Sequence, residues 1–387
     1  WNVIYSLGLL MGIGGSVIFS TLRGGKRNKK EDENEYFTAA VIGSVVLASL
    51  AWAGIICFER PVLLFFGAEE VTLSLAQVYL VPIKYVFPCF LFNQMLAAFL
   101  RNDKNPGLAT GAVLSGGIFN VVGDYVFVFV LDMGIFGAGL ATAMGSVITF
   151  LVMLTHFLTK RNTLALVRPF RALDKMRKIV ITGFSTFFID VAMGILTVLF
   201  NRQIMKYLGT DALAVYGVIV NVSTFVQCCA YSVGQAAQPI ISINYGAKLG
   251  GRIKETLKYS LAMAVFFSAF WTALTLMVPN LFIKIFMSPT PEVLQIAPGI
   301  IRVYGISFLL LPLNIFSTYY FQALMKPKAA FFVSVSRGMV ISGLLILSLP
   351  VLLRPDALWM AMPVTELVVV VFVMARMKKY TKELSIS

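Results

Sequence analysis

The sequence feature that most constrains the fold is a series of long apolar runs, each of about 20 residues or more and carrying few charges. Such a run can cross the roughly 30 Å hydrocarbon core of a bilayer as one helix. Eleven runs follow one another, near 1–22, 37–58, 72–100, 107–131, 135–158, 179–207, 212–243, 256–285, 293–325, 329–350 and 357–375. Charged residues make up only 13% of the chain, whereas soluble domains carry about 25%. The chain is therefore predicted to be an all-α, multi-pass membrane protein.

The basic residues behind the net charge of +14 lie mostly in alternate connections between the runs. The connections after the first, third, fifth, seventh and ninth runs, together with the C-terminus, hold most of the 32 Lys and Arg residues. This is the positive-inside pattern, which predicts that these loops face the cytoplasm and that the protein lies in the cell (inner or plasma) membrane. The charge is thus assigned to topology, and a nucleic-acid partner is not expected.

An internal repeat is indicated by one offset that relates two distant motifs. Shifting the numbering by 222 superposes Gly12 on Gly234, Ser20 on Ser242, Gly24 on Gly246, Lys26 on Lys248, Phe99 on Phe321 and Lys104 on Lys326. The sequence therefore predicts two six-helix lobes related by a pseudo-two-fold repeat, at 1–160 and 179–387, with a cytoplasmic linker at 161–178. The helix that would match 179–207 falls before residue 1. We therefore expect about 11 helices here and 12 in a full-length protein that begins earlier.

Metal and cofactor chemistry finds little support in the sequence. The four cysteines all lie in apolar runs without ligand spacing, and are interpreted as small buried hydrophobic residues. The single histidine, His156, has no His, Cys or acidic cluster near it in the sequence. No catalytic set of residues is evident, so an intramembrane enzyme is not expected. No cofactor is expected either.

Asp190 is the intramembrane carboxylate of most interest, because charged groups are costly at membrane depth and mark ion pathways. It lies eleven residues before Asn201, which is close to three helical turns, so both side chains share one helix face. Desolvation disfavours the charged form of a carboxylate, so Asp190 could take up and release a proton. Alternatively, Asp190 and Asn201 could bind Na⁺ with helix carbonyls. The simpler interpretation is a structural carboxylate bonded to a neighbouring helix.

Three other intramembrane charges have structural interpretations. Asn120 and Asp124 are four residues apart and share a helix face, either binding a helix end or lining a substrate cavity. Glu366, in the last run, is predicted to form a structural ion pair with Arg337 of the preceding run. A role of this pair in transport is the less favoured alternative.

The stretch GQAAQPIISINYGAKLGGRIK (234–254) places polar residues at the cytoplasmic end of an apolar run. Pro239 removes one backbone donor and favours a bend, which would present Gln235 and Gln238 to a cavity. These two amides either line a binding site or satisfy the bent backbone. The glycines lack the spacing of a phosphate-binding loop.

Several of these stretches resemble the multidrug and toxic compound extrusion (MATE) family, in its bacterial branch. The similar segments are FLRNDKNPGLATGAVLSGGIFNVVGDYVFVFVLDMGIFGAGLATAMGS, GFSTFFIDVAMGILTVLFNRQIMKYLGTDALAVYGVIVNV, GQAAQPIISINYGAK, YYFQALMKPKAAFFVSVSR and ALWMAMPVTELV. The resemblance runs through essentially the whole chain, and these segments are its most similar parts. The loop STLRGGKRNKKEDENE is more charged than the short glycine turn usual in that family.

The resemblance implies a V-shaped transporter of two six-helix lobes around a central cavity. It implies antiport, in which an H⁺ or Na⁺ gradient drives export of amphipathic, often cationic drugs by alternating access. Members of the family carry an acidic residue in the seventh helix, usually Glu, and Asp190 stands there. A lipid-linked oligosaccharide flippase of the same superfamily is the alternative. The predicted partners are small-molecule drugs and the lipid bilayer, and the protein is predicted to be a monomer.

Overall fold

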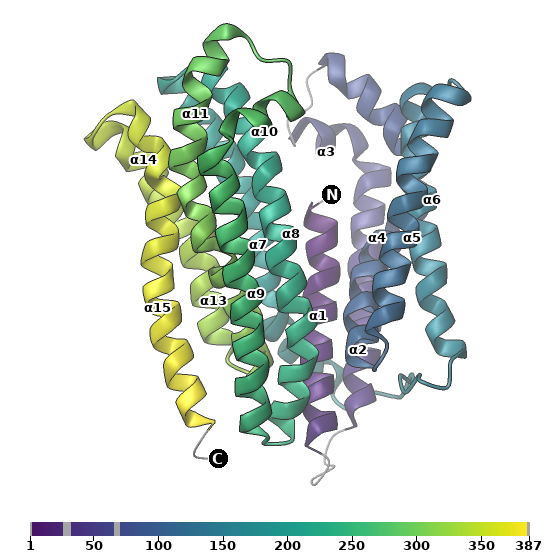
Figure 1. Ribbon diagram of the computed structural model, residues 1–387. Coiled ribbons are helices and arrows are strands. Elements are labelled where there is room, and N and C mark those ends of the chain that lie inside the picture. The colour runs from purple at the N-terminus through teal and green to yellow at the C-terminus, as the bar shows by residue number, and fades with distance from the viewer. Residues whose placement is uncertain (1, 26–31, 66–69, 385–387) are drawn as a thin grey trace. The chain divides into compact units, whose positions relative to one another are not determined.

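The computed structural model describes residues 2–25, 32–65 and 70–384, and it is built from helices connected by short loops (Figure 1). Eleven helices among these residues are long and apolar enough to span a membrane. The described residues contain no strand. The all-α, multi-pass fold predicted from the sequence is therefore confirmed. Part of the charged loop STLRGGKRNKKEDENE lies outside the described residues.

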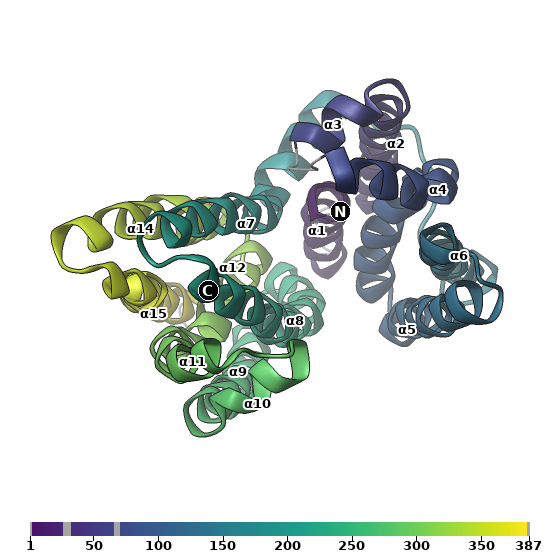
Figure 2. The same cartoon turned by 90° about the horizontal axis from the view of Figure 1, so that it is seen from above.

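The chain divides into two compact units, residues 1–20 with 29–183, and residues 21–28 with 184–387. The second unit begins inside a helix, and the predicted linker 161–178 belongs to the first unit. The elements before this division are α1 (Asn2–Gly24), α2 (Glu33–Cys57), α3 (Glu59–Phe65), α4 (Glu70–Asn102), α5 (Pro106–Asp124), the π-helical η1 (Tyr125–Val130), α6 (Gly134–Leu154), the short η2 (Thr155–Leu158) and α7 (Ala172–Tyr207), which crosses the division. Within the first unit, α6 packs against α4 and α5 (Figure 2).

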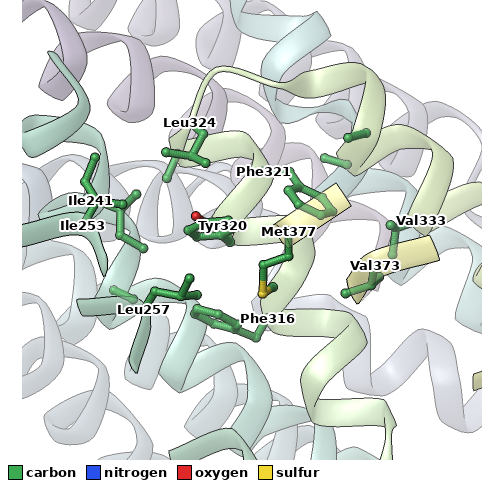
Figure 3. Close-up of a cluster of buried hydrophobic side chains, with 14 of the residues drawn as sticks. Ile241, Ile253, Leu257, Phe316, Tyr320, Phe321, Leu324, Val333, Val373 and Met377 are labelled. Carbon is green, nitrogen blue, oxygen red and sulfur yellow. The ribbon is translucent and has the colours of Figure 1, made fainter. Parts of the chain in front are cut away.

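The second unit continues after α7 with a larger set of helices. They are α8 (Thr210–Gly246), α9 (Gly250–Met277), α10 (Pro279–Phe286), α11 (Pro291–Gly305), η3 (Ile306–Leu309), α12 (Leu311–Ala323), α13 (Pro327–Val335), the π-helical η4 (Ser336–Val340), α14 (Ile341–Leu352), η5 (Pro355–Met360) and α15 (Ala361–Glu383). Helix α12 is almost entirely buried and packs against α8, α9 and α15. Phe316, Tyr320 and Phe321 of α12 lie at the centre of the buried cluster in Figure 3.

Proline sets several helix starts, because it lacks an N–H that the first turn does not need. It occupies one of the first positions of α5, α10, α11 and α13. The apolar run predicted at 256–285 is in fact two helices, because α9 ends at Met277 and Pro279 starts α10. Pro279 also restricts the backbone of Val278, which leaves helical geometry at φ −130° and ψ 50°.

The internal repeat extends to the helix boundaries. Shifting the numbering by 222 moves the short helix α3 from 59–65 to 281–287, and α10 covers 279–286. The same shift moves α4 from 70–102 to 292–324, and the span formed by α11, η3 and α12 covers 291–323. A short helix that precedes a proline-containing span therefore recurs at equivalent positions in both halves, as two homologous halves require.

A close helix crossing joins the end of α1, whose residues 21–25 belong to the second unit, to α8. A Cβ on Gly24 would contact the carbonyl oxygen of Ile243, and a Cβ on Gly246 would contact that of Thr21. Both added carbons would lie too close to backbone atoms for any side-chain adjustment to relieve the contact. The offset of 222 relates Gly24 to Gly246 and Thr21 to Ile243, so each half supplies the same glycine to this crossing.

Gly246→Ala is expected to destabilise the protein by about 1–3 kcal/mol, because the added methyl group forces two backbones apart. Gly217→Ala is the matched control on the same helix, since a Cβ there has no atom within 4 Å. That change should stabilise the protein by up to about 1 kcal/mol, through helix propensity alone. Thermal unfolding of both variants in detergent checks this. Equal shifts of the same sign would show that the crossing is not close-packed.

Candidate functional site

Asp190 lies near the middle of the membrane-spanning helix α7, where its carboxylate meets a polar pair from α8. Tyr231 donates a hydrogen bond through its hydroxyl to Asp190 Oδ1 at 3.1 Å. The same hydroxyl lies 3.4 Å from Gln227 Oε1, so its single proton can serve either acceptor. Gln227 and Tyr231 are four residues apart and therefore share one face of α8. The half-buried carboxylate of Asp190 is thus linked through the Tyr231 hydroxyl to the amide oxygen of Gln227.

A small cavity of about 50 Å³ lies beside this group, inside the second unit. Its walls include Gln227, Ser223 and Arg337, together with apolar residues of α7 and aromatic residues of α8 and α11. A volume of this size admits a few water molecules. The cavity is therefore large enough to hydrate the polar groups around it but too small for a drug.

Across the cavity, Arg337 and Glu366 form a buried ion pair. Arg337 Nε lies 2.6 Å from Glu366 Oε1, and Asn314 Nδ2 donates to Glu366 Oε2 at 2.7 Å. Glu366 is fully buried, and the side chain of Arg337 is 10% exposed. The structure thus brings together the two charges expected to pair. Arg337 lies in the π-helical segment η4, a type of helical irregularity frequent at functional sites.

Asn201, the second residue expected at the Asp190 site, does not lie there. Helix α7 is continuous from Ala172 to Tyr207, so eleven residues separate the two positions by about 16 Å along its axis. They share a helix face, as expected, but a single cation cannot contact both side chains at that distance. A contribution of Asn201 to coupling, apart from this shared site, stays a prediction.

Asn120 and Asp124 lie on α5 in the first unit and do not contact each other through a hydrogen bond in the described structure. Asn120 donates to Thr142 Oγ1 at 3.2 Å, and this hydroxyl lies 3.0 Å from Tyr79 Oη. Asp124 is the last residue of α5, where the π-helical η1 follows, and its Oδ1 is buried without a partner among the described residues. Asn120 therefore holds three helices together, and a substrate role for either residue stays a prediction.

Gln235 and Gln238 lie on α8, which continues as one helix through Pro239. Gln238 is only 1% exposed, and Gln235 is half-buried. Ser242 Oγ donates to the carbonyl oxygen of Gln238 at 2.9 Å, so side-chain groups do satisfy backbone in this stretch. Neither amide lines the cavity beside Arg337. Their proposed contact with a substrate stays a prediction.

His156 has a partner that its sequence neighbourhood did not indicate. Its Nε2 lies 2.8 Å from Asp103 Oδ2, and its Nδ1 lies 3.0 Å from Asn105 Nδ2. Both His156 and Asp103 are fully buried, and 53 residues separate them in the sequence. No group of three or more His, Cys, Asp or Glu among the described residues could hold a metal ion. The pair therefore joins the ends of two helices.

Comparison with known proteins adds a family relationship to this geometry. The family model MatE matches residues 1–126 and 184–346, which is most of the chain. The Multidrug export protein MepA of Staphylococcus saprophyticus subsp. saprophyticus is 25% identical over 343 residues, covering 88% of this chain and 74% of the relative.

Solved structures of similar proteins share the fold. An outward-facing multidrug resistance MATE family transporter of the MOP superfamily aligns with a TM-score of 0.88 at 18% identity, covering all of this chain and 86% of that one. The MATE multidrug transporter DinF-BH, solved in complex with a ligand, aligns with a TM-score of 0.86 at 25% identity. That alignment covers 98% of this chain and 84% of the other.

Proposed function

Since this chain belongs to the MatE family, whose family model matches most of its length, we propose that it is a cation-coupled multidrug antiporter. In this proposal Asp190 is the residue that binds the coupling ion. Its relatives are multidrug export proteins, and a solved multidrug transporter of the same fold was captured with a bound ligand. These findings support a multidrug efflux transporter of small molecules. The coupling to an ion and the antiport cycle are the parts that we propose beyond this.

The observation that carries the proposal is the difference between two carboxylates within the membrane-spanning helices of the second unit. Glu366 is already neutralised by Arg337 at 2.6 Å. Asp190 has a neutral phenol as its hydrogen-bond partner, and no described basic side chain forms an ion pair with it. An ionised carboxylate at this depth is costly. Binding of H⁺ or Na⁺ removes that cost, so Asp190 is the group whose charge state can bias the protein between two conformations.

Proton and sodium coupling make different demands on the residues around Asp190. A proton needs the carboxylate alone, whereas dehydrated Na⁺ needs several oxygen ligands. The Tyr231 hydroxyl, which contacts Asp190, and the Gln227 amide oxygen beside that hydroxyl are the further oxygens proposed to serve. In the proposed cycle, ion binding from one side of the membrane favours one conformation, and drug binding after ion release favours the other. The basic loops face the cytoplasm in this scheme, as the charge bias predicts.

The test is dye transport by the purified chain in proteoliposomes, with a pH gradient or a Na⁺ gradient imposed separately. A fluorescent cationic dye should move against its own gradient with one of the two ions and not without either. Tyr231→Phe then distinguishes the ions. It should reduce Na⁺-driven transport by about tenfold or more, but leave H⁺-driven transport within about threefold of the original. Dye movement that ignores both gradients would overturn the antiport proposal.

A further inference from the structure

The connection between η2 and α7, residues 159–171, is held to the first unit by side chains of α2. Three of its backbone N–H groups donate to the first turns of that helix: Ala165 to Asn34 Oδ1 at 3.1 Å, Val167 to Thr38 Oγ1 at 3.0 Å, and Phe170 to Glu35 Oε2 at 2.7 Å. Backbone that would otherwise be free is therefore bonded at three positions along the segment. The connection has one defined path over the protein.

Both ends of the connection are fixed as well. Near its start, Thr163 donates through its backbone N–H to Asp103 Oδ2 at 2.8 Å, and its hydroxyl bonds Asp103 Oδ1. Just beyond its end, Lys175 Nζ lies 2.8 Å from Glu35 Oε2 and donates to the carbonyl oxygen of Phe170 at 3.0 Å. The groups that hold the connection are thus used within the first unit, and the remaining side chains can face outward.

The outward side chains are a mixture of large apolar and basic residues. Leu158, Leu166, Phe170 and Leu173 are 88%, 69%, 70% and 86% exposed. The exposed basic residues are Lys160, Arg161, Arg168, Arg171 and Arg177. Lys178 is also exposed, but it donates to Tyr36 Oη and is not counted with them. Asp174 is the one acidic residue in 157–178, and it is exposed too. We call these four apolar and five basic residues the linker strip.

The position of the linker strip places it at the surface of the membrane. One spanning helix ends at Leu158 and the next begins at Ala172, so the connection runs from one membrane crossing to the next at a single face. Large apolar side chains there are unfavourable in water but favourable at the boundary of headgroups and acyl chains. Lys and Arg beside them match the phosphates of that boundary. The strip carries both kinds of group in one fixed segment.

We infer that the linker strip binds anionic phospholipids of the leaflet that it faces, with Leu166, Phe170 and Leu173 in the headgroup–acyl boundary and the arginines on lipid phosphates. Five basic residues against one acidic residue favour an anionic lipid over a neutral one. Each Lys or Arg near an anionic surface strengthens binding by about fivefold. This inference does not depend on which ion or drug the protein transports.

The first test compares two triple variants of the full chain that remove the same charge. Arg161, Arg168 and Arg171 are replaced by Gln in the strip variant. Three exposed basic residues elsewhere are replaced by Gln in the control: Lys206 at the end of α7, Lys284 in α10 and Arg354 just before η5. Retention of phosphatidylglycerol is measured by native mass spectrometry after titration in detergent. The strip variant should bind this lipid about 100-fold more weakly, whereas the control should stay within about threefold. Equal losses in both variants would overturn the inference.

The second test keeps every basic residue and measures depth directly. A nitroxide on Leu166→Cys, in a background with the four native cysteines replaced by alanine, reports collisions with oxygen and with a water-soluble nickel chelate. In nanodiscs containing phosphatidylglycerol, oxygen should relax the label more than the chelate does, and phosphatidylcholine alone should weaken this preference. A label that the chelate reaches freely in both membranes would show that the strip faces water. A label shielded from both reagents would point to a protein partner, and either result refutes the inference.

Discussion

Asp190→Asn should reduce gradient-driven dye transport by about 100-fold or more, while leaving the protein folded. Asparagine matches aspartate in shape and can still accept the hydrogen bond from Tyr231, which donates at 3.1 Å in the native protein. It cannot bind a proton and has no charge to hold Na⁺. An ion shifts the equilibrium between two conformations only if it binds one of them more tightly than the other. The asparagine variant lacks the group that binds the ion, so the gradient cannot drive the conformational change. Dye transport in proteoliposomes measures the loss of activity, and thermal unfolding checks that the variant is folded.

Asp124→Asn is the matched control, because it also removes a carboxylate from a membrane-spanning helix. Asp124 ends α5 and lies within six residues of the end of its span at Val130, whereas Asp190 lies near the middle of its own. We expect the control to retain transport within about threefold. Asp190→Glu, which keeps the carboxylate and lengthens the side chain by one methylene, should retain gradient-driven transport at a changed rate. Full transport by Asp190→Asn, or its loss in the Asp124 control alone, would remove Asp190 from the mechanism.

Arg337→Met should lower the free energy of unfolding by about 3–5 kcal/mol, the cost of leaving one member of a buried ion pair without its partner. Glu366 is fully buried, and its remaining partner would be the Asn314 amide at 2.7 Å. Adding Glu366→Gln to this variant removes the unpaired charge and keeps an acceptor for Asn314. The double variant should therefore recover most of the lost stability, which thermal unfolding in detergent measures.

An exposed ion pair supplies the control for this cycle. Lys326 Nζ and Glu383 Oε2 lie 3.8 Å apart, and their side chains are 37% and 47% exposed. Lys326→Met should change stability by less than about 1 kcal/mol, because solvent already screens that pair. If Arg337→Met cost no more than Lys326→Met, the buried pair would not stabilise the second unit. If the double variant stayed as unstable as Arg337→Met, the loss would come from packing around Arg337.

The sequence predicted the spans closely because a bilayer sets their length and composition, and both are visible in one chain. The helix boundary at Pro279 is the exception. Hydropathy does not detect it, because the sequence stays apolar from the end of α9 into the start of α10. Apart from the pair of Arg337 and Glu366, contacts between residues distant in the sequence were not predicted. Asp103 and His156 are 53 residues apart, and the acceptors on α2 lie about 130 residues before the N–H groups that they bind.

The Asp190 site was predicted in part, because a lone acid in an apolar run is conspicuous. Its partners Gln227 and Tyr231 are polar residues spaced for one helix face, which is a signal that could have been read from the sequence. Asn201 was suggested because it shares a helix face with Asp190. The two residues are about 16 Å apart along the helix axis, however, which is too far for one ion to contact both side chains. Asn314 carried a weaker signal, as one amide within the apolar start of α12.

The crossing of α1 and α8 has a local two-fold symmetry. Thr21 and Gly24 from the first repeat meet Gly246 and Ile243 from the second, and each contact is the exchanged copy of the other. A surface that meets its own copy in this way is the isologous interface of a two-fold-symmetric dimer. The crossing therefore has, inside one polypeptide, the contact pattern by which two identical subunits would pair across a two-fold axis.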